Sequence, residues 1–128
     1  MYLESDKDLW DLLESTTAEK FETNLFFVGK DMQGSVDTVL FQHLLRSIDG
    51  EDVSIPALRN ILIKEEFRNQ KIFSRLILSL EKFGKPFMVD DVVNHKVLDP
   101  FFKKRGYRRY HYEKNGHTID CWIFNPPS

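Results

Sequence analysis

The sequence lacks the features that mark several large classes of protein. Cys121 is the only cysteine in 128 residues, so no intrachain disulfide can form, and a reducing cytoplasm is the simplest setting. No apolar run approaches the length of a membrane span, and Met1 to Asp6 lack the basic and apolar regions of a signal peptide. No internal repeat or low-complexity linker interrupts the chain. We therefore expect one cytoplasmic domain over residues 1–128, with no metal site.

The sequence also lacks an excess of basic over acidic residues. The formal net charge is −2 and the sequence pI is about 6.1, which argues against a protein built mainly to bind nucleic acid. The charges are unevenly spread, because residues 1–22 are acidic and residues 101–114 are basic. Hydrophobic residues make up 41% of the chain and aromatic residues 13%, which is enough to form a real core in a domain of this length.

Hydrophobic periodicity and turn signals predict a mixed α/β fold. The segment 35–48 is ambiguous, because its apolar residues fit a helical period while Asp49-Gly50 is typical of a hairpin turn; we predict a strand. Ser5 is expected to cap a first helix that runs to about Lys20 and buries Phe21, and Asp99-Pro100 to begin a short third helix. The predicted strands are residues 1–3, 24–30, 37–47, 53–64, 87–93, 107–112 and 118–124, and the second helix runs from about residue 69 to Gly84.

One junction between a strand and a helix is the first candidate site. The run Ile61-Leu62-Ile63 reads as a buried strand, and an amphipathic helix face begins at Ile72. A helix that opens directly after a strand presents unpaired backbone N–H groups and the positive end of its dipole, which together favour phosphate. Inside the same strand, the polar pair Arg59 and Asn60 indicates either a cleft on one face or a sheet margin.

Two regions resemble the GNAT N-acetyltransferase superfamily. Residues 63–73 resemble its acyl-CoA signature, a hydrophobic strand end followed by R/Q-x-x-G-x-G/A. Val92-Val93-Asn94, followed by the stretch 101–107, resembles a second conserved region, a strand ending near an Asn and a short helix closing in an aromatic-Lys-x-Gly-aromatic pattern. With their strand and helix context, the two regions cover about residues 53–124.

The resemblance implies a fold, an activity and a set of contacts. The fold would be a mixed, mostly antiparallel sheet of six or seven strands, split in a V between two parallel strands and flanked by about three helices. The activity would be transfer of an acetyl group from acetyl-CoA to an amine, by direct attack of the amine on the thioester. Asp91 and His95 are candidate bases. The contacts implied for CoA involve Leu62, Ile63, Arg68, Asn69, Gln70, Lys71, Ile72, Phe73 and Asn94.

The chain departs from the family pattern at three positions. Lys71 and Phe73 stand where the family has Gly or Ala, which let the backbone approach the pyrophosphate. Phe102 aligns with a Tyr that many members use to reprotonate the leaving thiolate. These losses support a second reading, a catalytically inactive GNAT fold that serves as a binding or assembly module, similar to compact relatives encoded by bacteriophages.

The basic residues 103–109 are interleaved with Tyr107 and leave several roles open. They could hold the 3′-phosphate end of CoA, an acidic protein partner or, least expected, a nucleic acid. They could equally cap a helix and keep an edge hairpin soluble.

Overall fold

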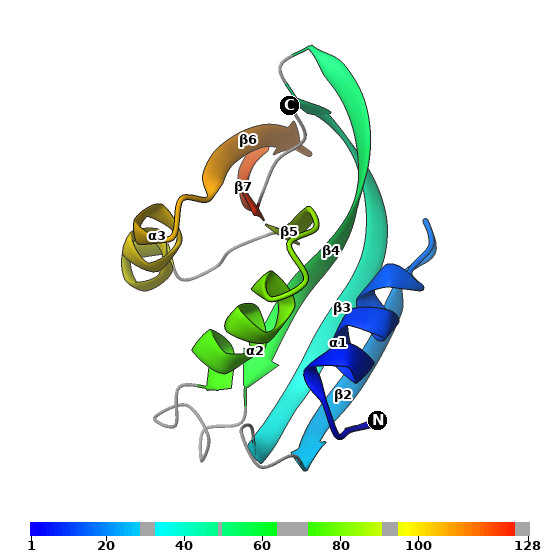
Figure 1. Cartoon of the computed structure of the whole chain (residues 1–128). Helices are drawn as coiled ribbons and strands as arrows, with labels where there is room; N and C mark the ends of the chain where they lie inside the picture. Colours follow the sequence, from blue (N-terminus) through cyan, green and yellow to red (C-terminus); the bar gives the residue numbers. More distant parts are fainter. Residues whose placement is uncertain (29–32, 49, 64–71, 91–94, 125–128) are drawn as a thin grey trace.

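A computed structural model describes residues 1–28, 33–48, 50–63, 72–90 and 95–124 of the chain (Figure 1). Within these residues, seven strands and three helices follow one another. The elements are β1 (Tyr2–Leu3), α1 (Asp6–Glu14), β2 (Phe21–Val28), β3 (Gln33–Ile48), β4 (Glu51–Ile63), α2 (Ile72–Glu81), β5 (Phe87–Asp90), α3 (His95–Lys104), β6 (Arg108–Lys114) and β7 (His117–Phe124).

All seven strands join one sheet in the order β1-β2-β3-β4-β5-β7-β6. The pairs β1–β2 and β4–β5 are parallel and the other neighbours are antiparallel. The predicted fold class, a mixed and mostly antiparallel sheet with about three helices, is confirmed. The central parallel contact is short: it runs from Ala57–Met88 to Arg59–Asp90, while β4 continues to Ile63.

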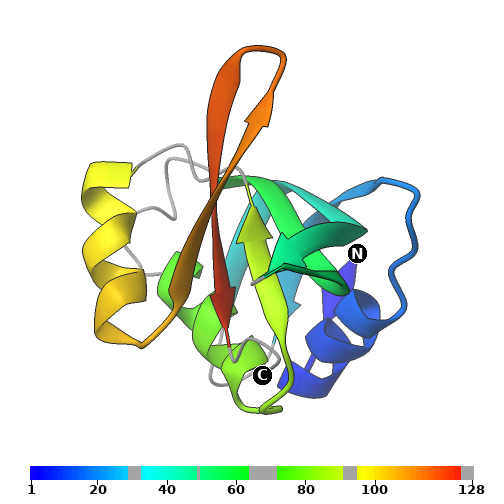
Figure 2. The ribbon, with the colours of Figure 1, turned by 90° about the horizontal axis from the view of Figure 1, so that it is seen from above.

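The three helices pack on one face of the sheet, which we call the helix face (Figure 2). Each helix contributes an apolar side: Leu9 and Leu13 from α1, Leu76 from α2 and Phe102 from α3 are fully buried there. This follows from the apolar spacing of three and four residues along the helices. Among the described residues, no helix is both long and apolar enough to cross a membrane.

The opposite face has a smaller core built from strand residues alone, and we call it the helix-free face. Its buried apolar residues are Leu44, Ile55, Ala57, Met88, Cys121 and Ile123. These side chains are buried although none of the described helices packs on them. The sheet's own curvature therefore supplies the cover, and Figure 1 shows β3 and β4 bending along their length.

Several predicted boundaries hold and two are wrong. The strand predicted over 37–47 is confirmed as part of β3, and Asn115-Gly116 makes the β6–β7 turn with φ of 51° and 77°, as a type I′ turn requires. The first helix, however, ends at Glu14, because the chain turns there and the Thr17 carbonyl accepts a hydrogen bond from the backbone N–H of His43 on β3. Phe21 is exposed on β2 and not buried under the helix.

The start of the third helix is the second error. The helix begins at His95, so Asp99 is not its cap and Pro100 lies inside it. A proline at the sixth residue of a helix removes one intrahelical hydrogen bond. The next two residues, Phe101 and Phe102, pack against the core of the helix face.

Candidate functional site

The strand β4 carries a bulge just past its last pairing with β5. Arg59 pairs with Leu40 and Leu62 pairs with Thr38, so Asn60 and Ile61 together oppose a single residue of β3. Asn60 has φ of 50°, a left-handed conformation that asparagine tolerates better than most residues. A bulge removes backbone groups from the regular ladder and turns them toward other partners. The sequence had marked this point through its polar pair.

Arg59 is buried in a polar network on the helix-free face. Its Nε lies 2.8 Å from Asp90 Oδ2, an ion-pair contact rather than an aligned hydrogen bond. Its Nη1 donates to Gln42 Oε1 at 2.9 Å, and Gln42 Nε2 donates to the Ala18 carbonyl at 2.7 Å. The network therefore connects the chain after α1 with three neighbouring strands. The Asp90 side chain has no exposed surface, so loss of Arg59 would leave its carboxylate buried without this partner, which is energetically costly.

A second arginine reaches the same carboxylate from far along β3. Arg46 Nη2 lies 3.6 Å from Asp90 Oδ2. Yet Arg46 lies six residues beyond Leu40, which pairs with Arg59 beside Asp90. Six strand residues span about 20 Å in a flat sheet, farther than one arginine side chain extends. The β3–β4 hairpin must therefore curl over the helix-free face, which explains how this face is buried without a helix.

Four of the residues implied in CoA binding lie in described elements. Leu62 is 48% exposed on β4, which suits a ligand contact, and Ile63 ends the same strand. Ile72 begins α2, but its side chain is 1% exposed in the core, so only its backbone can face a ligand. Phe73 is half-buried. The remaining predicted contacts, Arg68, Asn69, Gln70, Lys71 and Asn94, lie outside the described residues.

The structure does not describe the side chains of the two candidate bases. Asp91 lies outside the described residues. His95 is the first residue of α3, and only its backbone is described. Asp90, the carboxylate before Asp91, is instead described and occupies the buried network.

Phe73 packs against α3. Its ring lies 5.9 Å from that of Phe101 and 6.1 Å from that of Phe102, both in edge arrangements. Phe102 in turn stacks on Trp122 at 5.4 Å. Phe102 is fully buried in this cluster and has no hydroxyl, so it supplies no proton to a leaving thiolate. The aromatic cluster joins the first turn of α2 to α3 and to β7.

The predicted basic surface is partly neutralised inside the molecule. Arg105 binds the Glu81 carboxylate with Nε–O distances of 2.8 and 2.9 Å, and Tyr107 donates to the same group. Burial, with the charge of Glu81, raises the pKa of Tyr107. Arg109 donates to Asp120 at 2.8 Å and contacts Asp99 at 3.4 Å. These contacts favour the structural role for this surface.

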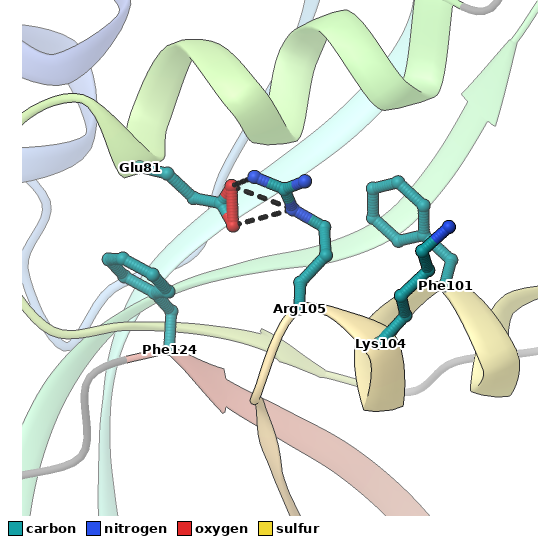
Figure 3. Close-up of a pocket in the computed structure, with 5 residues that line it drawn as sticks. All are labelled: Glu81, Phe101, Lys104, Arg105 and Phe124. Carbon is teal, nitrogen blue, oxygen red and sulfur yellow. Dashed lines mark hydrogen bonds and ion pairs between the residues drawn. The ribbon is translucent and has the colours of Figure 1, made fainter.

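A surface cavity of about 550 Å³ lies between the carboxyl ends of α2 and α3. Figure 3 shows the Arg105–Glu81 pair between the rings of Phe101 and Phe124, with Lys104 beside Phe101. This cavity lies at the opposite end of α2 from Ile72 and Phe73, so it is separate from the junction predicted to bind phosphate.

The seven-stranded sheet, its central parallel pair and its three helices form the mixed α/β arrangement that the sequence predicted. No family model matches the chain, and no curated protein matches it significantly in sequence. Three similar solved structures are Arabidopsis thaliana NAA60 with a bisubstrate analogue, Arabidopsis thaliana Naa50 with the analogue CoA-Ac-MVNAL, and Ard1 from Thermoplasma volcanium.

These similarities are distant. Identities are 15%, 12% and 13%, and TM-scores are 0.43, 0.43 and 0.41. The matches cover 74%, 70% and 68% of this chain, and 66%, 65% and 68% of the three structures. The chain thus spans just under two thirds of NAA60 and Naa50.

The sequence did not predict that the buried carboxylate of Asp90 contacts both Arg59 and Arg46. The polar residue Arg59 within an apolar strand was a usable signal for a buried partner. Arg46 gave no such signal, because its contact depends on the curl of a long hairpin.

Proposed function

We propose that this chain is a GNAT-like N-acyltransferase that moves an acetyl group from acetyl-CoA to an amine. The observation that carries the proposal is the bulge at Asn60, because it lies immediately beyond the last β4–β5 pair and turns backbone groups of a central strand away from the ladder. A bulge N–H placed there could polarise a thioester carbonyl lying between the strands.

The other parts of the site follow from their places in the fold. β4 beyond Arg59 would align the pantetheine arm beside Leu62 and Ile63. The amino end of α2, with the preceding residues 68–71, would hold the pyrophosphate through backbone N–H groups. Lys71 would add a point charge for a phosphate.

The proposed reaction is a direct transfer. The neutral amine nitrogen attacks the thioester carbon, the new C–N bond forms, and the C–S bond breaks as the tetrahedral intermediate collapses. CoA leaves as a thiolate, and the proton lost by the amine passes to a base. Asp91 and His95 stay the candidate bases. Because Phe102 replaces the usual tyrosine, the thiolate takes its proton from another donor.

Calorimetric titration with acetyl-CoA tests the proposal. We expect saturable binding to the native chain, and tighter binding to a Phe73→Gly variant if the ring narrows the entry beside α2. The Leu78→Gly variant serves as a control, because it removes an exposed side chain farther along α2 and introduces the same residue. No heat from the native chain, with binding restored by Lys71→Gly and Phe73→Gly together, would refute activity and support an inactive binding or assembly module.

A further inference from the structure

Two arginine side chains contact the Asp90 carboxylate, and they differ in distance and in exposure. Both arginines approach the same oxygen, Oδ2, at 2.8 Å for Arg59 and 3.6 Å for Arg46. The Arg59 side chain is 9% exposed and is fixed further by Gln42. The Arg46 side chain is 21% exposed, and its Nη1 donates to the neighbouring Leu45 carbonyl. Arg59 is therefore the closer and more deeply buried partner of Asp90, and Arg46 is the more distant and more exposed partner.

The contact between Arg46 and Asp90 lies near the bulge that we propose binds the thioester. Asp90 is the register partner of Arg59, and Arg59 directly precedes the bulge at Asn60. The Arg46 head group reaches this point only because the β3–β4 hairpin curls over the helix-free face. A cation lying where the Arg46 guanidinium lies would thus contact Asp90, whose register partner Arg59 directly precedes the bulge assigned above to the thioester.

From this geometry we infer that Asp90 is the binding group for a cationic acceptor, and that Arg46 occupies the acceptor's place until the acceptor displaces it. The inference rests on the proposed function for the meaning of "acceptor", but the cation site itself does not. The substrate class is a primary amine that arrives as an ammonium ion and gives one proton to a base before its neutral nitrogen attacks the thioester. Exchange of Arg46 for the acceptor leaves the buried Arg59–Asp90 pair in place.

The exchange has a measurable consequence. If Arg46 fills the site most of the time, the apparent affinity for a small ammonium is reduced by the fraction of molecules in which the site is vacant. Truncation of Arg46 removes that competition and leaves Arg59 paired with Asp90. Lysine at the same position keeps a competing cation.

The experiment uses n-propylammonium as the probe and follows binding by NMR chemical shifts at constant ionic strength. We expect Arg46→Ala to bind the probe about tenfold or more tightly than the native chain, and Arg46→Lys to stay within about twofold of it. Arg75→Met, which removes an exposed arginine of α2, should leave binding unchanged. Thermal melts confirm that each variant folds.

Two results would overturn the inference. One is equal affinity in Arg46→Ala and the native chain; the other is equal tightening in Arg46→Lys, which would indicate a packing effect. Acetyl-CoA titration of the same proteins separates the two proposals. Loss of acetyl-CoA binding in all of them, with the amine pattern intact, would refute the acyltransferase and leave the cation site. Acetyl-CoA binding without the amine pattern would refute only the cation site.

Discussion

The two faces of the sheet are buried by different means. The helix face is covered by α1, α2 and α3 and is packed with large apolar and aromatic side chains such as Leu9, Phe87 and Trp122. The helix-free face is covered by the curl of its own strands and contains the buried pair Arg59 and Asp90. Helices can bury a wide surface with apolar side chains alone, whereas a curled hairpin brings distant residues of one strand onto another.

The two faces therefore contribute differently to the stability and to the specificity of the protein. Apolar packing contributes most of the free energy of folding, and replacing it leaves cavities. Buried ion pairs contribute little net stability, because desolvation offsets most of their attraction. A buried pair on the face without helices is therefore better explained by positioning or binding than by stability.

The largest expected effect tests whether the helix-free face is closed. Cys121 has no exposed surface and pairs in register with Asp90. Burial, reinforced by the Asp90 charge, raises the pKa of its thiol from 9.0 to about 12, so its thiolate fraction near pH 8 falls about a thousandfold. We expect reaction with a disulfide reagent to be slower than that of the unfolded chain by at least this factor.

The matched control is Ser54→Cys in a Cys121→Ser background, because Ser54 is exposed on β4. This thiol should react as fast as one in an unfolded chain. Fast reaction of native Cys121 under folding conditions would mean that the curl opens readily, and the two faces would then differ in rigidity as well as in chemistry.

The next effect concerns the apolar packing of the helix face. Phe102 is fully buried and contacts the rings of Phe73, Tyr107 and Trp122. Phe102→Ala should lower the free energy of unfolding by about 3–5 kcal/mol in urea titrations, because the cavity cannot collapse among rigid rings. Leu78→Ala, at a position 38% exposed on α2, should cost less than about 1 kcal/mol. A small loss for Phe102→Ala would show that the aromatic cluster packs loosely.

Local patterns predicted the elements, because turn chemistry and apolar spacing act over a few residues. Asp49-Gly50 correctly overruled the helical period of β3, and Asn115-Gly116 specified the last hairpin. The predicted end of α1 was wrong, because the helix ends at Glu14 and the Thr17 carbonyl then accepts a hydrogen bond from His43 on β3. The partners of Asp90 were missed for the same reason: they are set by sheet curvature, which no local pattern encodes.

The smallest effect tests whether ion pairs on the helix face are only structural. Burial disfavours ionisation of Asp120, but the hydrogen bonds and charges of Arg109 and His111 outweigh it and hold the pKa of the carboxyl below 3.8. A carboxyl whose pKa is lowered by folding stabilises the protein above its unfolded pKa, and this stabilisation is lost as the pH falls through the folded pKa. Asp120→Asn should therefore flatten the loss of stability below about pH 4 and cost about 1–2 kcal/mol near neutrality, because the amide still accepts a hydrogen bond.

Urea titrations from pH 2.5 to 7 measure this slope, with Asp37→Asn, an exposed carboxyl of β3, as the control. An unchanged acid slope in Asp120→Asn would mean that the Arg109 pair is not maintained in solution. Arg109 would then be available to an anionic partner, and the basic surface of residues 103–109 would regain the binding role that its intramolecular ion pairs now argue against. The structural assignment of the helix face thus depends on whether Asp120→Asn changes this slope, just as the binding assignment of the helix-free face depends on the effect of Arg46→Ala.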